Sequence, residues 1–235
     1  MTAISRIKVY ATQPHSCSYL DEEIATTLFI DPETEIDQST YSELSDLGFR
    51  RSGKHIYRPH CYNCKACIST RILANDFKPR RSQRRIWKRN RDLDVTICDD
   101  ISDDRYYQLY RRYIAERHRD GDMYPANREQ YDSFLSSEWH VTRYYVFSLN
   151  DEMVAVSVTD ELKQGLSAIY TFYNPDLPER SLGSYAILWQ IEACKTLGLP
   201  YLYLGYWIKS CDKMRYKIDY RPTQLLIDDR WLTLR

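Results

Sequence analysis

Three cysteines at a regular spacing are the first residues in this sequence whose types could do chemistry. Cys61, Cys64 and Cys67 stand in RPHCYNCKACISTR, with His60 just before the first of them. Thiolates bind zinc or an iron–sulfur cluster, but a closed tetrahedral site needs a fourth ligand, which Cys17 or His60 could supply. A metal or cluster on Cys17, Cys61, Cys64 and Cys67 is one interpretation. The alternative is a set of buried or redox-sensitive thiols.

Length and cysteine usage limit the class of protein. A chain of 235 residues is long enough for one large domain or two small ones. No apolar run is long enough for a signal peptide or a membrane span, so we expect a cytoplasmic protein with no membrane partner. Its seven cysteines are then unpaired thiols. Cys98, Cys194 and Cys211 are scattered, which is typical of packing residues.

The charges are segregated along the chain, although 33 basic residues balance 33 acidic ones. Residues 21–46 carry nine carboxylates and no Lys or Arg, whereas eight of the fourteen residues in 78–91 are Lys or Arg. This basic segment, with Trp87 inside it, suits a nucleic-acid backbone, because cations displace counterions and an indole can stack on a base. The alternative is a solvated helix whose cations pair with the acidic segment.

The elements that must position these residues can be read from the apolar periodicity. Residues 105–121 show the spacing of an amphipathic helix, and residues 142–173 form three β-branched and aromatic runs that indicate an antiparallel meander. Residues 184–198 predict a buried helix that ends at a glycine. Residues 200–208 are apolar on both faces, which predicts a central strand.

Helix, meander, helix and central strand is the order of an acetyltransferase-like (GNAT) domain. We therefore predict an α/β (α+β) fold with this domain over residues 93–235, preceded by a smaller cysteine-containing and basic region over residues 1–92. In a GNAT fold, the turn before the second helix binds the pyrophosphate of acyl-coenzyme A. Arg180 and Gly183 match that turn, but Tyr185 stands where a small residue is needed, which favours another acyl donor.

Six motifs extend this pattern over nearly the whole chain. They are CSYL at 17–20, YRPHC-x-x-C-x-A-C at 57–67, RSQRR at 81–85, LSAIYTFYNP at 166–175, RSLGSYAIL at 180–188 and YLYLGYWI-x-x-C-x-K-M-x-Y-K at 201–217. In this order they resemble the bacterial aspartate/glutamate leucyltransferases, relatives of the arginyl-tRNA–protein transferases. The resemblance implies transfer of leucine from leucyl-tRNA to the N-terminal α-amino group of proteins that begin with Asp or Glu, in the N-degron (N-end rule) pathway of protein degradation.

That chemistry needs alignment and the removal of a proton more than it needs a covalent nucleophile. An α-amino group has a pKa of about 7.7–8.0 and is mostly protonated at pH 7, so a nearby group must help to remove its proton. We predict Asp160 and Tyr170 as the proton-handling and orienting catalytic pair. The alternative for Tyr170 is a core aromatic residue in a chain with 21 tyrosines.

Selection of an acidic N-terminus requires fixed cations, and the planar fork of arginine matches a carboxylate. Arg71 and Arg84 are the candidates for this role. Arg180 and Gly183 are predicted to face the terminal adenosine or its phosphate, and the remaining substrate-binding candidates are Ser181 and Tyr206. The acceptor stem of the tRNA would lie along residues 78–91, contacting Lys78, Arg80, Arg81, Arg85 and Lys88.

The resemblance also bears on the cysteines. In arginyltransferases an N-terminal cysteine set is associated with an iron–sulfur cluster, but here Leu20 occupies the position of a second early cysteine. An iron–sulfur cluster or zinc therefore stays an open prediction, and no cofactor is expected to be required for transfer. The expected partners are aminoacyl-tRNA and proteins with N-terminal Asp or Glu, without DNA. The alternatives are an arginyl-tRNA–protein transferase and a metal-dependent RNA-binding protein without transferase activity.

Overall fold

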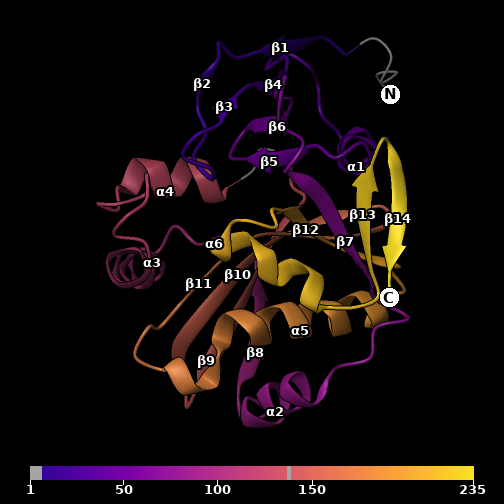
Figure 1. The fold of residues 1–235 in the computed structure, drawn as a ribbon. Coiled ribbons are helices and arrows are strands. Elements are labelled where there is room, and N and C mark those ends of the chain that lie inside the picture. Colours follow the sequence, from indigo (N-terminus) through magenta and orange to yellow (C-terminus); the bar gives the residue numbers. More distant parts are fainter. Residues whose placement is uncertain (1–6, 137–138) are drawn as a thin grey trace.

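An eight-stranded mixed sheet forms the centre of the protein in the computed structural model, which describes residues 7–136 and 139–235 (Figure 1). The strand order is β14-β13-β7-β12-β11-β10-β9-β8, and only β11 and β12 pair in parallel. The strands are β7 (Ile68–Leu73), β8 (Asp94–Cys98), β9 (Thr142–Leu149), β10 (Glu152–Leu162), β11 (Gly165–Tyr173), β12 (Tyr201–Trp207), β13 (Thr223–Ile227) and β14 (Arg230–Leu234).

Shorter strands from the N-terminal part of the chain lie above the large sheet in Figure 1. A four-stranded sheet has the order β1-β4-β6-β5, and β2 pairs with β3. Because β7 already belongs to the large sheet, the two main sheets divide between β6 and β7, and the domain boundary after residue 92 stays a prediction. The strands are β1 (Val9–Ala11), β2 (His15–Ser16), β3 (Ile24–Ala25), β4 (Thr27–Ile30), β5 (Arg50–Ser52) and β6 (His55–Pro59).

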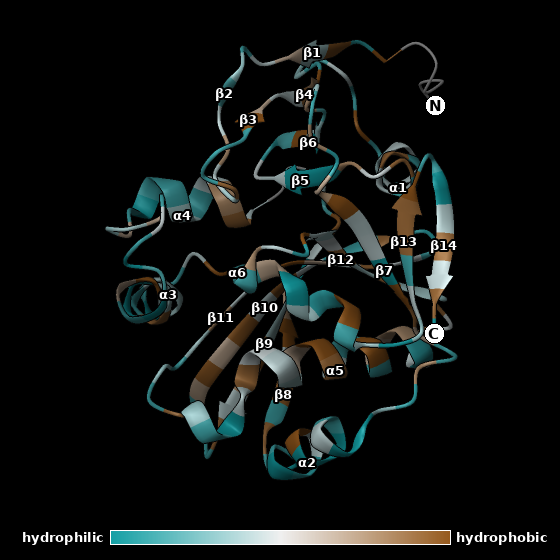
Figure 2. Ribbon diagram, in the orientation of Figure 1, coloured by the Kyte–Doolittle hydropathy of each residue, from teal (hydrophilic) through white to brown (hydrophobic). Residues whose placement is uncertain are grey.

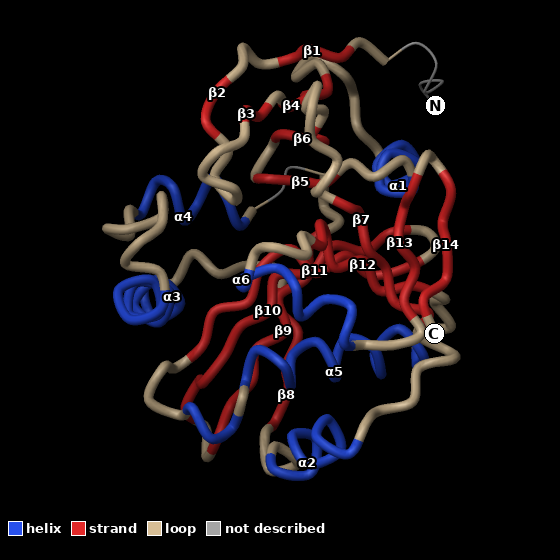
Figure 3. The backbone as a smooth tube through the Cα atoms, in the orientation of Figure 1, coloured by secondary structure: helices blue, strands red, loops and turns tan. Residues whose placement is uncertain are grey.

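Helices cover both faces of the large sheet (Figure 3). One face packs on α5, with α2 beside it, and the other packs on α3 and α4. The helices are α1 (Gln38–Asp46), α2 (Arg81–Arg89), α3 (Asp104–Arg117), α4 (Arg128–Leu135), α5 (Leu182–Thr196) and α6 (Asp212–Arg215), with 3-10 turns η2 (Pro178–Arg180) and η3 (Tyr216–Asp219).

The alternation of side chains along β10 explains the two-sided core. Val156 and Val158 point to the α3 side and pack near Tyr110, whereas Ala155 points to the α5 side and packs near Leu182. Both faces are apolar, which makes the central strands brown in Figure 2, while α2 is largely teal. In the described part of the chain, no helix has the length and apolar character needed to cross a membrane.

The elements predicted from periodicity are confirmed. The meander is β9-β10-β11, the buried helix is α5, and the central strand is β12, which lies between β11 and β7. The first predicted helix is α3, which ends at Arg117 because His118 caps it, four residues before its predicted end. The basic segment is helical only over Arg81–Arg89, and Arg80 is the N-cap.

Candidate active site

Strands β11 and β12 separate along most of their length. They pair only over Gly165–Ser167 and Tyr201–Tyr203, although β11 continues to Tyr173 and β12 to Trp207. Beyond the paired residues, backbone groups that face the gap need hydrogen-bond partners from elsewhere, because an unpaired buried carbonyl is costly. The gap between β11 and β12, here called the strand split, is therefore a polar site in the middle of an apolar sheet.

The guanidinium of Arg50, from β5, reaches into the strand split. Its Nη1 donates to Ser167 Oγ at 2.8 Å, and its Nη2 donates to the Ala168 carbonyl at 2.5 Å. On the other strand, Gly205 has a φ of +77°, and a Cβ at this position would lie 3.1 Å from Arg50 Nε. Glycine at 205 thus lets the guanidinium lie against β12.

Lys217, from η3, is the second cation at the strand split. Its Nζ donates to the Tyr206 carbonyl at 2.7 Å, which satisfies an acceptor of β12. Burial lowers the pKa of this amine to about 7, and the positive charge of Arg50 adds to the effect. Near neutral pH, Lys217 is therefore partly uncharged, in contrast to an exposed lysine.

A cavity of about 360 Å³ lies between the N-terminal strands and β12. Tyr206, one of the predicted substrate-binding residues, lines it, and the Tyr206 hydroxyl donates to the Gly48 carbonyl at 2.9 Å. Aromatic, hydroxyl and histidine side chains make up most of its lining residues, so its wall combines apolar ring surface with a few polar groups. Further lining residues are His15, Tyr19, Thr27, Phe29, Ser52, His55 and Tyr57.

The four predicted ligand cysteines gather around this cavity. Cys17, Cys61 and Cys67 line it, and Cys64 and His60 line an adjoining cavity of about 350 Å³. Burial raises the pKa of the Cys67 thiol to about 12, with further contributions from the neighbouring thiols. Among the described residues, no three or more Cys, His, Asp or Glu side chains are arranged to bind a metal ion. As placed, the thiols do not fit a metal or cluster, and that assignment stays a prediction.

Asp160 lies outside the strand split in a closed network of its own. Its carboxylate accepts from Arg51 at 2.7 and 2.9 Å, from the Tyr41 hydroxyl at 2.9 Å and from the Thr142 hydroxyl at 2.7 Å. The residue has no solvent exposure. A carboxylate with four internal donors has no free position for a substrate proton, which argues against the predicted proton-handling role.

Tyr170 is packed among aromatic rings on the α3 side of the sheet. Its ring centroid lies 5.4 Å from that of Phe134 and 6.3 Å from those of Tyr110 and Tyr113. The hydroxyl is buried and has no hydrogen-bond partner among the described residues. Burial raises the pKa of Tyr170, so the hydroxyl stays protonated. This position supports the core alternative, and the predicted pairing with Asp160 is not formed.

Arg71 is already occupied by internal partners. Its Nε donates to Gln224 at 2.7 Å and its Nη1 to Asp46 at 2.7 Å. The guanidinium carbon lies 3.7 Å from the ring centroid of Tyr201 and 4.1 Å from that of Trp231. An arginine that stacks on two rings and pairs with a carboxylate holds neighbouring elements together. This geometry therefore argues against Arg71 as the residue that binds a substrate carboxylate.

The turn before α5 has a specific internal arrangement. Arg180 donates to both oxygens of Asp92 at 2.9 and 2.8 Å, and Ser181 adopts a left-handed φ of 51° as the N-cap of α5. A Cβ on Gly183 would lie 3.2 Å from the ring of Tyr173. Tyr185 is buried toward the core, so its side chain does not cover the helix N-terminus, contrary to the steric argument drawn from the sequence.

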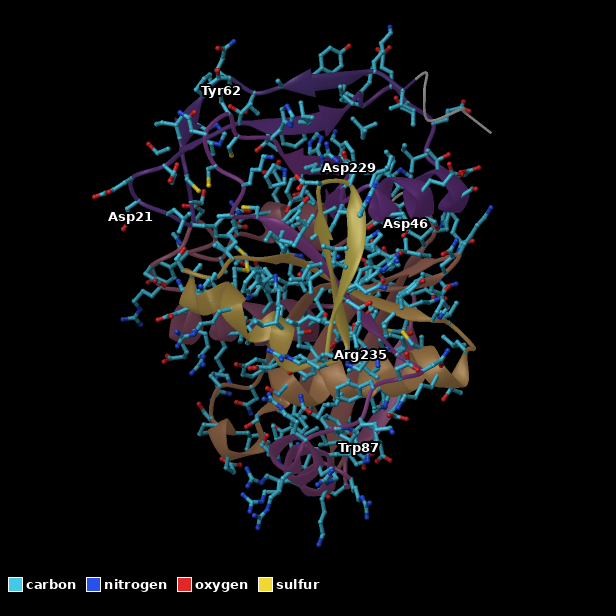
Figure 4. The ribbon with its side chains drawn as sticks, turned by 45° about the vertical axis from the view of Figure 1, so that its right-hand side comes forward. Asp21, Asp46, Tyr62, Trp87, Asp229 and Arg235 are labelled. Carbon is cyan, nitrogen blue, oxygen red and sulfur yellow. The ribbon has the colours of Figure 1, made fainter. Side chains whose placement is uncertain are left out.

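The cationic residues predicted to bind tRNA are brought together on and next to α2. They lie at the opposite end of the molecule from the cysteine segment, as the labels of Trp87 and Tyr62 show in Figure 4. The centroid of the Trp87 ring lies 5.5 Å from that of Tyr185, so the indole packs against the protein and is not free to stack on a base. The exposed cations are Lys78, Arg80, Arg81, Arg84, Arg85, Lys88, Arg89 and Arg91. Arg84 therefore belongs to this basic surface and not to a carboxylate pocket.

Sequence reasoning missed Arg50 and Lys217. Arg50 bonds to residues 117 and 118 positions away, a relationship that no local pattern reveals. Lys217 was present only as the last residue of the motif at 201–217. Lys217 stands among other charged residues in KSCDKMRYK at 209–217, so no local pattern indicated that this lysine in particular would be buried.

The comparisons with known proteins identify the chain. The family model described as Arginine-tRNA-protein transferase, C terminus, matches residues 105–227, and its N-terminal counterpart matches residues 15–85. The whole chain is 55% identical to 97% of an aspartate/glutamate leucyltransferase of Teredinibacter turnerae, and 56% identical to such an enzyme of Pseudomonas fluorescens at full coverage of both. These matches define a transferase of the acyltransferase class. The chain belongs to the arginine-tRNA–protein transferase family, among the aspartate/glutamate leucyltransferases.

Solved structures offer only distant likenesses. The C-terminal domain of a lysylphosphatidylglycerol synthetase from Agrobacterium fabrum is 14% identical, with a TM-score of 0.47 over 71% of this chain and 51% of that one. FemX is 9% identical, with a TM-score of 0.45 over 89% of this chain and 82% of that one. These scores are too low to carry an argument, so the mixed α/β architecture rests on the strand order itself.

Proposed function

We propose that this protein transfers leucine from leucyl-tRNA to the N-terminal α-amino group of proteins that begin with Asp or Glu. The observation that carries the proposal is the 55% identity to aspartate/glutamate leucyltransferases over the full chain. The product would carry a new N-terminal leucine that marks it for degradation. The cytoplasm, where aminoacyl-tRNA is made and used, is the compartment that this reaction requires.

The reaction is an acyl transfer between two bound substrates. The neutral amine attacks the ester carbonyl of leucyl-tRNA, a C–N bond forms, and the C–O bond to the terminal ribose breaks. The nitrogen loses one proton, and the ribose oxygen that leaves takes up one proton to become a hydroxyl group. Because the ester is already activated, positioning the two reactants accounts for most of the catalysis. Neither a covalent enzyme intermediate nor a cofactor is required by this chemistry.

The proposed site for this step is the strand split. The order of β9, β10, β11, α5 and β12, with a parallel pair that opens, supports a GNAT-like domain, and the opening presents the polar groups of Arg50 and Lys217 to a substrate. The exposed cations of α2 support binding of the tRNA acceptor stem, since they present phosphate-binding charge without interspersed acids. The 3′ end would then run along α5, which packs on α2, to the strand split.

The test offers the purified protein tRNA charged with either radiolabelled leucine or radiolabelled arginine, together with peptides that begin with Asp, Glu, Arg or Ala. We expect label to pass from leucyl-tRNA to the Asp and Glu peptides alone. Transfer of arginine would change the donor and keep the reaction class. Binding of tRNA without transfer of either label would overturn the proposal and favour an RNA-binding role.

A further inference from the structure

Strand β5 presents its three residues to two different environments. Arg51 points into the closed network with Asp160, whereas Arg50 and Ser52 lie on the other face of the strand, because side chains alternate. Ser52 lines the cavity of about 360 Å³, and Tyr57, which pairs with Arg50 across β5 and β6, lines it as well. Arg50 therefore lies beside this cavity, between it and the strand split.

Arg50 lacks an acidic partner among the residues that the structure describes. Every other described arginine that is buried or half-buried forms an ion pair with a carboxylate, so the difference is specific to this residue. The pairs are Arg51 with Asp160, Arg58 with Asp229, Arg71 with Asp46, Arg128 with Asp132, Arg143 with Glu161 and Arg180 with Asp92. A half-buried guanidinium without a counter-charge is costly, and an anionic ligand would offset that cost.

The guanidinium also has hydrogen-bond capacity to spare. It carries five N–H donors, and its bonds to Ser167 and Ala168 use two of them. These two bonds go to neutral oxygens, so they fix the orientation of the fork without neutralising its charge. The remaining donors are enough for a bidentate contact with a carboxylate.

The surroundings of Arg50 are positive and hold no compensating acid among the described residues. Burial lowers the pKa of Lys217, and the charge of Arg50 lowers it further. Burial raises the pKa of Tyr57 and of Tyr206, and Arg50 opposes the rise in both. One guanidinium thus acts on three neighbouring groups at the cavity and the strand split, which is the electrostatic setting of an anion site.

We propose that Arg50 is the specificity residue that binds the side-chain carboxylate of the acceptor's N-terminal Asp or Glu. This assignment rests on the proposed function. The two arginines expected from the sequence are unsuited to the role, because Arg71 is clamped by Asp46 and Arg84 lies on the exposed basic surface of α2. The carboxylate would sit in the cavity beside Tyr57 and Tyr206, which brings the adjacent α-amino group to the strand split.

The experiment compares Arg50→Gln with the full-length wild-type protein, using peptides that differ only in an N-terminal Asp or Asn. We expect kcat/KM for the Asp peptide to fall about 100-fold, with little change for the Asn peptide, so that the Asp preference disappears. Arg143→Gln is the matched control, since Arg143 is also half-buried but is paired with Glu161. It should keep the Asp preference of the wild type.

Thermal unfolding of each variant checks that it folds. If Arg50→Gln does not fold, Arg50→Lys keeps the charge but loses the fork, and should lose about tenfold in Asp preference. An unchanged ratio of Asp to Asn transfer would overturn the assignment and leave the leucyltransferase function standing. A change confined to the KM of leucyl-tRNA would also overturn it, by making Arg50 a phosphate contact. Failure of the wild type to transfer leucine would overturn both.

Discussion

Arg51 and Asp160 form an ion pair in which neither side chain is exposed to solvent, with Nε 2.7 Å from Oδ2 and Nη2 2.9 Å from Oδ1. The pair joins β5 of the N-terminal sheet to β10 of the large sheet, and Arg51 Nη1 also donates to the Ser136 carbonyl at 2.6 Å. Because Arg50 directly precedes Arg51 on β5, this pair also fixes the position of Arg50, the residue proposed to bind the acceptor carboxylate.

Replacing one partner of this ion pair should destabilise the fold. Asp160→Asn leaves the Arg51 charge buried without a counter-charge, so the free energy of unfolding should fall by about 3–5 kcal/mol. Urea unfolding measures this loss. The matched control is Asp99→Asn, an exposed partner of Arg143, which should cost less than about 1 kcal/mol. Displacement of Arg50 would lower transfer to the Asp peptide alone, so a collapse of kcat per folded molecule for both the Asp and the Asn peptide in Asp160→Asn would make the carboxylate catalytic after all.

The buried amine of Lys217 should make stability depend on pH. Its pKa is about 7 in the folded protein and 10.5 in the unfolded chain, so between these values the unfolded state binds more protons. The free energy of unfolding should therefore rise from pH 7 to 10.5, by at most about 1.4 kcal/mol per pH unit, and below pH 7 the full cost of burying the charge is present.

The measurement compares urea unfolding of the wild type and of Lys217→Met at pH 6.5 and pH 9. Subtracting the free energy of unfolding of the variant from that of the wild type removes the contribution of all other titrating groups. The wild type should gain stability relative to Lys217→Met as the pH rises. A difference that stays constant or shrinks would mean that Lys217 remains charged in the folded protein.

A structural feature could be predicted from the sequence where it depends on residues close together in the chain, and not where it depends on contacts between distant segments. Helix α5 and the meander were predictable because their apolar periodicity is contained within each segment. The partnership of Arg51 with Asp160 spans 109 residues, and that of Arg71 with Gln224 spans 153. Arg71, a candidate ligand contact in the sequence, is therefore held by internal partners that the sequence did not reveal.

The strand split illustrates the same limit. The sequence predicted β12 as a central strand but contained no signal that its pairing with β11 would stop after three residues. The opening coincides with the register shift between Tyr203 and Gly205 and with the side chains of Arg50, from β5, and Lys217, from η3. The site is thus created by contacts between distant segments. The basic surface of α2, in contrast, could be predicted because its Lys and Arg residues lie together within residues 78–91.

The α2 surface should govern tRNA affinity without affecting acceptor choice. Arg84→Gln combined with Arg85→Gln removes two exposed cations, so the slope of log affinity against log salt should fall by about one per residue. Arg111→Gln, an exposed arginine on α3, is the control and should leave the slope unchanged. Filter binding of leucyl-tRNA across a salt series provides the measurement. An equal loss per arginine removed in the double variant and in Arg111→Gln would point to a diffuse charge effect.

The thiol of Cys67 should resist alkylation in the folded protein. Its pKa of about 12, raised by burial first and by the neighbouring thiols second, leaves roughly one molecule in ten thousand as thiolate at pH 8. Mass spectrometry after iodoacetamide should therefore find Cys67 labelled far more slowly than in the same protein unfolded in urea. A chelator should change neither this rate nor leucine transfer. Faster labelling after chelation would mean that a metal had protected the thiolate and would revive the ligand set of Cys17, Cys61, Cys64 and Cys67.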